Sequence, residues 1–350
     1  MAALKPWVCL LLLTGCQRPI PTPFASLATP DPVAIVVLEQ ALPPTGPQIQ
    51  ELGDQIREVM QNIHQTNKNW TQARDHLHQA QEILNQSKEA ILTVTPLQGY
   101  PQAQQSLSQL NITLAVWETA LQNQNFPAAH STGQQALWNL ATLRLALLTD
   151  YTAPPRPPAY STLPRKRGGW ALVRFTTDQG NFKVLVDGYN APTTAGAFLA
   201  AVQAGHFTKV QPTQQRNLVL LPTTVPRLPL EVRPSGQREL LYDPRQPPQS
   251  VLSFAPPGTI AFGPSGAGGQ FFLYFRDQTG ANLREDRYTT LGYVVAGLET
   301  VARLQERDHP LRAEILDCPT NNFGDAQPAP GSPVAVSCLL TGPLRLEHGR

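Results

Sequence analysis

Charge is scarce in this sequence, and neither sign is in excess. Charged residues make up 15% of the 350 residues, and the formal net charge is +2 at pH 7. A nucleic-acid-binding protein usually carries a clear basic patch, so this composition gives no indication of a nucleic-acid partner. Cysteine is also scarce, and none of the four stands at a metal-site spacing from a histidine. We therefore expect no metal site and no other cofactor.

The N-terminus lacks an apolar run long enough to cross a membrane. It reads "MAALKPWVCLLLLTGC", and the stretch from Trp7 to Leu13 is far shorter than the ~20 residues that a spanning helix needs. Lys5 precedes this stretch and small residues follow it, which is the layout of an export signal. We therefore predict that the protein is exported.

The signal ends at Leu13-Thr14-Gly15-Cys16, which resembles a bacterial lipobox. In such a motif the cysteine is lipidated and becomes the first mature residue. We expect residues 1–15 to be a signal peptide, Cys16 to hold a membrane anchor, and 16–32 to be a proline-rich tether. An ordinary cleaved signal and a buried N-terminal strand are the alternatives.

Cys318 and Cys338 are the two cysteines outside this signal. Exported compartments permit disulfides, so the two residues are a candidate pair. A disulfide bond between them would close the short loop from Cys318 to Cys338 and would stabilise the fold by roughly 3 kcal/mol. Two separate buried thiols are the alternative.

Proline, abundant elsewhere, is missing from Gln48 to Thr95, and apolar residues recur there every seven positions. This series consists of Ile49, Ile56, Ile63, Trp70, Leu77, Leu84 and Ile91. The pattern predicts one long helix packed lengthwise on others, with Trp70 in the core. Apolar spacing predicts further helices at 34–42, 107–121 and 136–147. We expect a four-helix-type bundle over 33–150, serving either recognition or a purely structural role.

The chain changes character after a proline-rich linker at 151–168. Apolar residues then alternate with period two in many short segments, which indicates antiparallel strands. Two helical segments interrupt them, at "APTTAGAFLAAVQAG" and "LETVARLQER". We predict a closed β-barrel with plugged ends over 169–320, followed by a tail at 321–350. The fold class is thus multidomain α + β.

Four segments identify a family by their order and spacing. They are "FTTDQGNFKVLVDGYNAPTTAGAFLAAVQAG", "PGTIAFG", "GGQFFLYF" and "DRYTTLGYVVAGLETVARL". Together they resemble the cyclophilin-type peptidyl-prolyl cis-trans isomerase family. The likeness is greatest to its multidomain members of the thylakoid lumen, which place a helical bundle before the barrel and have a counterpart of "LPLEVRPSGQRELLY". The resemblance implies a closed antiparallel eight-stranded barrel, capped by two helices, with a proline-binding groove.

The groove is expected around Gln270, Phe271 and Phe272. Side chains of a strand alternate between its faces, so Gln270 and Phe272 share one face and Phe271 points the other way. The resemblance implies that Phe272 receives a proline ring and that the Gln270 amide binds the peptide backbone. It places five further residues at positions that line the pocket: Leu218, Val219, Leu221, Leu283 and Tyr288.

The sequence departs from the family at the catalytic arginine, whose position falls on Gln214. A neutral amide does not replace a planar cation with five donors. Arg216 lies two residues further on and is a candidate substitute, since it would share the face of Gln214 in a strand. We therefore expect little or no isomerase activity.

These observations favour an assembly factor over an efficient enzyme. The resemblance implies a role in photosystem II assembly in the thylakoid lumen, with proline-containing segments of client proteins, such as lumenal loops of photosystem II subunits, as partners. Two alternatives stay open: an active peptidyl-prolyl isomerase, and a general periplasmic chaperone unrelated to photosynthesis. The expected location is a membrane surface in the thylakoid lumen or the periplasm.

The anchor can be tested at Cys16. We expect the mature protein to partition with membranes, and Cys16→Ala to release it or to block processing, because the lipid is attached at this thiol. Mass spectrometry of the mature N-terminus measures this directly. An unmodified mature chain that begins after Cys16 would exclude the anchor.

Overall fold

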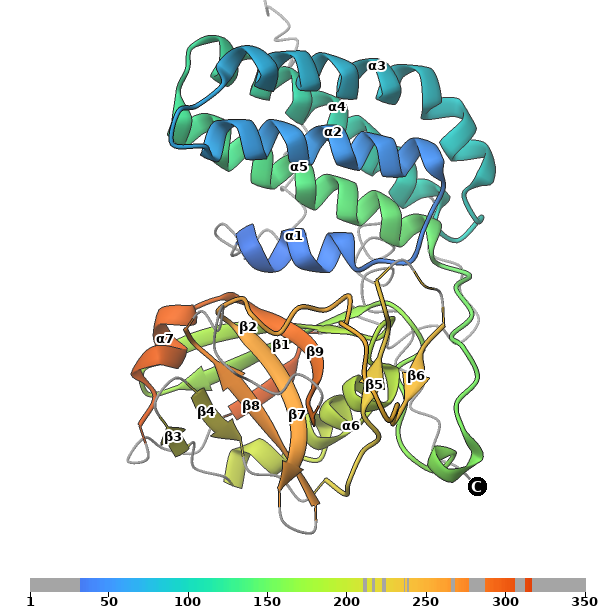
Figure 1. Cartoon of the computed structure of the whole chain (residues 1–350), viewed down its shortest axis with the longest axis vertical. Helices are drawn as coiled ribbons and strands as arrows, with labels where there is room; N and C mark the ends of the chain where they lie inside the picture. The colour runs from blue at the N-terminus through green and yellow to red at the C-terminus, as the bar shows by residue number, and fades with distance from the viewer. Residues whose placement is uncertain are drawn as a thin grey trace, which may run out of the picture.

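A computed structural model describes residues 32–209, 213–215, 218–221, 225–235, 237, 239–265, 268–276, 287–305 and 312–316. Helices make up its first half and a curled antiparallel sheet its second (Figure 1). The first half contains five helices: α1 Pro32–Gln40, α2 Pro47–His64, α3 Trp70–Val94, α4 Tyr100–Gln122 and α5 Phe126–Leu147. Within the described residues, no helix is both long and apolar enough to cross a membrane.

Helices α2 to α5 pack in a ring, because α2 contacts α3 and α5, and α4 contacts α3 and α5. The apolar residues of the seven-residue spacing supply the core: Ile49, Ile56, Ile63, Leu77, Leu84 and Ile91 are all buried. Prolines stand in the first turn of α2, α4 and α5, where a missing N–H costs no helical hydrogen bond. Trp117 of α4 is fully buried at the centre.

The prediction of one long helix through residues 48–95 is wrong. The chain turns between His64 and Asn69, and the Asn69 side chain caps α3 by accepting a hydrogen bond from the Gln72 N–H at 3.1 Å. Ile63 lies at the end of α2 and Trp70 at the start of α3, yet they are seven residues apart. The seven-residue spacing of apolar residues therefore continues across the turn and gives no sign of it. Trp70 begins α3 and is half-buried, so it packs against the helical core without being enclosed in it.

The second half contains an eight-stranded antiparallel sheet with the order β10-β1-β2-β9-β7-β8-β4-β3. Its strands are β1 Trp170–Thr177, β2 Gly180–Asp187, β3 Thr213–Gln215, β4 Leu218–Leu221, β7 Thr259–Ser265, β8 Gly268–Tyr274, β9 Thr289–Ala296 and β10 Arg312–Ile315. Helices α6 Pro192–Gln203 and α7 Leu298–Arg303 accompany it, with short 3-10 turns at Pro158–Tyr160 and His206–Lys209. A separate pair, β5 Glu231–Val232 and β6 Leu241–Tyr242, belongs to the long segment between β4 and β7, which we call the insert.

The sheet curls around a core of aromatic rings. Phe175 and Phe182 stack at 4.7 Å, and Phe198 of α6 packs against them and against Phe271 of β8. Such rings bury a large apolar area and pack in defined tilted geometries, which fixes α6 on the sheet. The prediction of a helical region followed by a curled antiparallel sheet with two helices is therefore confirmed. Closure of the barrel and the four-helix type of the bundle stay predictions.

Helix α1 joins the two halves, since it contacts both α5 and β9 (Figure 1). Outward-facing side chains of the sheet belong to the same apolar core as the helices, namely Trp170, Leu172, Leu185, Tyr293 and Val295. The side-chain amide of Asn190 donates to the Ala41 carbonyl at 2.9 Å, next to the end of α1. The helices therefore cover the outer face of β1, β2 and β9.

A buried ion pair fixes α1 in this position. Glu39 and Arg144 are almost fully buried, and an Arg144 nitrogen lies 2.6 Å from a Glu39 carboxylate oxygen. The same guanidinium donates to the carbonyls of Glu39, Leu42 and Pro43, so it also fixes the chain that leaves α1. Arg57 of α2 lies 2.5 Å from the other carboxylate oxygen. One carboxylate thus ties α1 to two other helices.

We expect Arg144→Ala to lower the free energy of unfolding by about 3 kcal/mol or more, because a buried carboxylate loses a partner. Urea unfolding followed by tryptophan fluorescence measures this loss. Lys88→Ala removes an exposed cation from the same half and should change stability by less than about 0.5 kcal/mol. Equal losses in the two variants would show that the ion pair does not hold α1.

Lys166 and Asp187 lie fully inside the junction between linker and sheet. Burial lowers the pKa of Lys166 to about 8, although the nearby Asp187 acts in the opposite direction. Burial also raises the pKa of Asp187, against hydrogen bonds that its carboxylate accepts from Asn190 and from the Tyr189 N–H. The fold therefore holds a lysine whose charged form is penalised relative to the unfolded chain.

This lysine makes stability depend on pH. Its folded pKa is depressed, so its stabilising contribution is complete above the unfolded pKa near 10.5 and is lost as pH falls through about 8. Between pH 7.5 and 9.5, we expect the protein to gain about 2 kcal/mol relative to Lys166→Met. Urea titrations at the two pH values measure this difference. Lys88→Met should keep the pH dependence of the unmodified protein, and the same dependence in Lys166→Met would refute the assignment.

Candidate functional site

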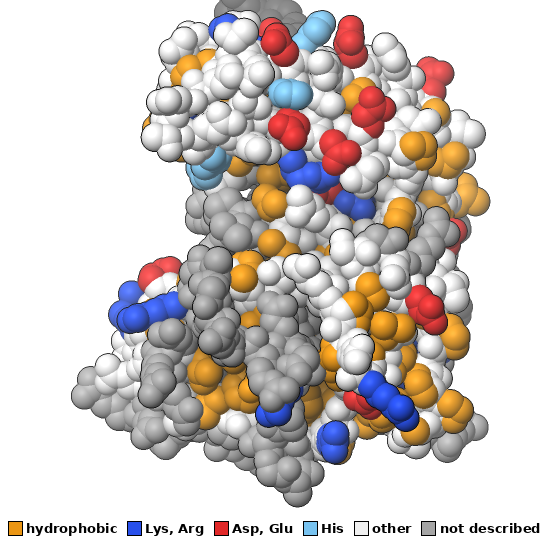
Figure 2. Space-filling model, in the orientation of Figure 1, with side chains coloured by type: hydrophobic (Ala, Val, Ile, Leu, Met, Phe, Trp, Pro, Cys, Tyr) orange, Lys and Arg blue, Asp and Glu red, His pale blue; other side chains and the backbone are white. Residues whose placement is uncertain are grey.

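The second face of β8 carries an apolar cluster that is distinct from the inner core. Its members are Leu218 of β4, Phe254, Ala261 of β7, Phe272 and Tyr274 of β8, and Tyr288. Phe254, Ala261 and Tyr274 are buried, whereas Leu218, Phe272 and Tyr288 are half-buried. We call these six residues the aromatic surface. Hydrophobic side chains are exposed on the sheet half in Figure 2, whereas most acidic side chains on that face lie over the helices.

Aromatic contacts fix the geometry of this surface. The Tyr288 ring lies edge-on to Phe272 at 5.4 Å and stacks with Phe254 at 5.7 Å. Gly263 makes this possible, since a Cβ atom there would lie 2.3 Å from the Tyr288 ring and 3.2 Å from Phe272. The rings thus form a pre-shaped apolar wall, which suits a compact apolar group such as a proline ring.

The alternation predicted for residues 270–272 is confirmed. Phe271 is fully buried in the inner core, 4.9 Å from both Phe198 and Phe262. Phe272 lies in the opposite cluster and pairs with Leu220 and Ala261 across the sheet. Gln270 is half-buried and pairs with Gly263, two positions before Phe272 on the same strand. Alternation puts its amide on the face of the aromatic surface.

Two residues predicted to line the groove lie elsewhere. Val219 and Leu221 are fully buried in the inner core, where they pair with Leu273 and Phe271. Of the three β4 residues that we predicted, the aromatic surface receives only Leu218. The prediction placed neighbouring β4 residues on one wall, but a strand alternates its side chains, so residues 218 and 219 cannot share a face.

Gln214, the predicted position of the family's arginine, belongs to β3. It pairs with Val219, and directly paired residues project to the same face, so it lies on the side of the inner core. Its amide donates to the Ala302 carbonyl of α7 at 3.3 Å. Thr213, which pairs with Leu220, lies instead on the face of Phe272. The register therefore puts Thr213, rather than Gln214, beside the aromatic surface, and sequence spacing alone missed this residue.

Several predicted residues lie outside the described part of the chain: Cys16, Arg216, Leu283, Cys318 and Cys338. Tyr288 is described and contributes a ring to the aromatic surface. Within the described residues, no three His, Cys, Asp or Glu side chains are grouped so that they could hold a metal ion.

Two family models match the chain. Residues 31–146 match a model described as "Peptidyl-prolyl cis-trans isomerase CYP38-like, PsbQ-like domain". Residues 172–320 match the model of cyclophilin type peptidyl-prolyl cis-trans isomerases. The matched ranges correspond to the helical half and to the sheet half, respectively.

Two curated proteins are similar to parts of this chain. A protein of Synechocystis sp., named as a thylakoid lumen peptidyl-prolyl cis-trans isomerase, is 26% identical over 65% of this chain and 68% of its own length. The chloroplastic peptidyl-prolyl cis-trans isomerase CYP37 of Arabidopsis thaliana is 27% identical over 39% of this chain and 33% of its own. A cyclophilin-type isomerase structure from Cryptosporidium parvum covers 42% of this chain and 97% of its own, with 15% identity and a TM-score of 0.32.

Proposed function

The chain belongs to the cyclophilin-type peptidyl-prolyl cis-trans isomerase family, and we propose that it binds proline-containing segments of client proteins and isomerises them only weakly. The aromatic surface is the observation that carries this proposal. The family also supports our inference that the eight strands close into a barrel and that α2 to α5 form a four-helix-type bundle.

Binding rests on shape and on one polar group. Phe272 and Tyr288 present half-buried rings that a proline can contact without displacing the protein core. The Gln270 amide lies on the same face and offers both donors and an acceptor to a peptide backbone. This combination of an apolar wall and a single orienting amide is typical of small-ligand pockets.

Weak catalysis is proposed from the residue that β3 places beside the aromatic surface. Rotation about the prolyl amide meets a barrier of ~18–20 kcal/mol because resonance makes the C–N bond partly double. A catalyst must bind the twisted amide better than the planar one, and a cation directed at the amide nitrogen achieves this. Among the described residues of β3, the position beside the aromatic surface holds the neutral Thr213. The surface is thus suited to hold proline and poorly suited to rotate it.

The proposed location is the thylakoid lumen. The names of both curated relatives support it, since they assign those proteins to the thylakoid lumen and to the chloroplast. Lipidation of Cys16 would hold the protein at the membrane, near lumenal loops of membrane proteins. We propose that its clients include photosystem II subunits and that it acts during their assembly. A periplasmic location with other clients is the alternative.

Catalysis can be tested by placing an arginine on each face of β3. We expect Thr213→Arg to raise the rate of peptide isomerisation about ten- to a hundredfold, the equivalent of one charge-assisted interaction of ~1.5–3 kcal/mol. Gln214→Arg is the matched control, since it adds the same charge on the opposite face and should leave the rate unchanged. NMR exchange measurements on a proline-containing peptide report the rate.

Three results would contradict this account. A larger gain from Gln214→Arg would show that the family's arginine position is at Gln214 and that the register of β3 differs in solution. An unmodified rate equal to that of an ordinary cyclophilin would exclude weak activity, and a loss of that rate in Arg216→Ala would assign the cation to Arg216. Failure of Phe272→Ala to weaken peptide binding would exclude the aromatic surface as the binding site.

A further inference from the structure

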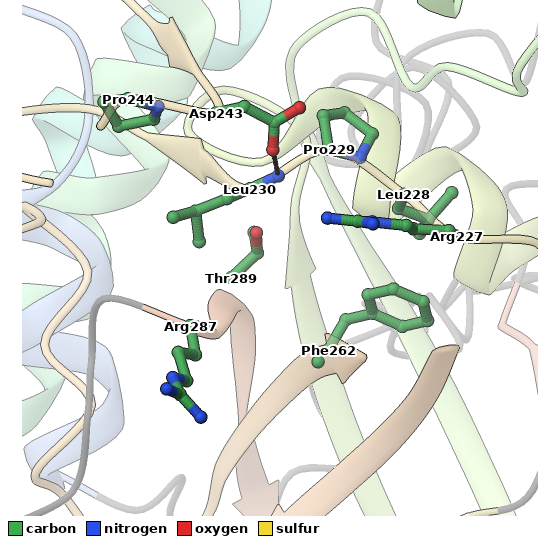
Figure 3. Close-up of a pocket in the computed structure, with 10 residues that line it drawn as sticks. Arg227, Leu228, Pro229, Leu230, Asp243, Pro244, Phe262, Arg287 and Thr289 are labelled. Carbon is green, nitrogen blue, oxygen red and sulfur yellow. Dashed lines mark hydrogen bonds between the residues drawn. The ribbon is translucent and has the colours of Figure 1, made fainter. Parts of the chain in front are cut away.

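A cavity of about 310 Å³ opens between the inserted segment and the sheet. The insert contributes residues 227–230 with Asp243 and Pro244, and the sheet contributes Phe262, Gly263, Arg287 and Thr289 (Figure 3). This volume is at the lower end of the ~300–1,000 Å³ that small-ligand sites occupy. It has room for an amino-acid side chain but not for a large cofactor.

Two arginines and one aspartate line the cavity. Arg227 and Arg287 are both exposed, and within the described part of the chain neither forms an ion pair. Figure 3 shows Arg227 extending toward the space between Leu230 and Phe262, with Arg287 at the opposite edge, below Thr289. The carboxylate of Asp243 is already engaged, because it accepts hydrogen bonds from the Leu230 N–H at 2.8 Å and from the Tyr160 hydroxyl. The cavity thus offers two guanidinium groups to an anion, against the one negative charge of Asp243, whose oxygens are held by these two donors.

The walls of the cavity are held in place by buried hydrogen bonds. Glu231, next to Leu230, accepts from the N–H groups of Thr193 and Thr194 at the start of α6, at 2.9 and 2.8 Å. Its own N–H donates to the Thr289 hydroxyl at 2.9 Å, which joins the insert to β9. The Asp243 N–H also donates a hydrogen bond to the Leu230 carbonyl at 2.9 Å. The insert is therefore pre-organised, so a ligand does not have to order it.

The cavity and the aromatic surface are neighbours at Gly263. This residue lines the cavity, and its Cα lies against the rings of Tyr288 and Phe272. Tyr288 also stands directly between Arg287 and Thr289 in the sequence, both of which line the cavity. A peptide whose proline contacts Phe272 would therefore reach the two arginines with a side chain only a few residues away, at ~3.3 Å per residue.

We propose that this cavity is a specificity site for an acidic side chain, glutamate or aspartate, of a peptide whose proline lies on the aromatic surface. The apolar parts of Leu230, Pro229 and Phe262 would contact the stem of the side chain, and the two guanidinium groups would bind its carboxylate. Arginine suits this role because its planar donors match both carboxylate oxygens. The inference rests on the proposed function, since it names a feature of the client segment.

Synthetic nonapeptides with one central proline test the site. Each carries a single Glu at one of the other positions, and its partner peptide carries Gln at the same position. Calorimetric titration of the full chain should show one or two positions at which Glu binds about three- to tenfold tighter than Gln. Raising the salt from 50 to 300 mM should reduce this preference, because the arginines are exposed.

Substitutions decide whether the cavity is responsible. Arg227→Gln and Arg287→Gln should each reduce the preference for Glu, and the double variant should abolish it without weakening the Gln peptide. Arg245→Gln removes an exposed arginine of the same insert that does not line the cavity, and it should keep the preference. Equal binding of Glu and Gln peptides at every position, or an unchanged preference in the double variant, would overturn the proposal.

The two proposals fail in different ways. If Gln peptides bind and Phe272→Ala weakens them, the aromatic surface holds proline whatever the result for Glu. If no peptide of either series binds, the proposed function itself is wrong, and the specificity site falls with it.

Discussion

The Glu39 carboxylate is buried between three helices, and its ion pairs hold α1 to α2 and α5. It receives Arg144 of α5 and Arg57 of α2, so displacing α1 would leave the buried Arg144 without its carboxylate partner, whereas Arg57 would keep its ion pair with Asp54. Helix α1 in turn lies on β9 and covers the apolar outer side of β1 and β2. The aromatic surface lies further along the sheet, on β7, β8 and β4.

The covered part and the open part of the sheet meet in one short segment. Leu252 belongs to the core that the helices share, whereas Phe254, two residues on, packs into the aromatic surface. Between them, the Ser253 carbonyl accepts a hydrogen bond from the Tyr293 hydroxyl at 2.5 Å. The ring of Phe254 stacks on Tyr288, which shapes the surface around Phe272. The seating of the helices therefore sets the rear wall of the aromatic surface by direct packing.

Sequence patterns correctly predicted features that depend on local periodicity, such as buried helical positions. They failed for features that depend on how distant segments of the chain pair or pack. The spacing of Ile49, Ile56 and Ile63 located buried helical positions, and alternation placed Phe271 and Phe272 correctly. The turn before Trp70 escaped detection because its length preserved the seven-residue spacing. Val219 was placed beside Leu218 on one wall and lies instead in the inner core, since neighbouring residues of a strand point to opposite faces. The cavity was not predicted at all, because Arg227 and Arg287 meet only through the docking of the insert on α6 and β9.

Where the cations stand determines what this surface does to a bound peptide. A cation aimed at the prolyl nitrogen interacts more strongly with the twisted amide than with the planar one, so its contribution appears in the rate. The arginines of the cavity lie to the side of the rings, and by our proposal they bind a carboxylate whose charge does not change as the amide rotates. Such an interaction stabilises ground state and transition state equally, which raises affinity and leaves the rate constant of the bound peptide unchanged. A cyclophilin fold with cations only in this lateral position would retain proline segments of acidic clients far better than it would isomerise them.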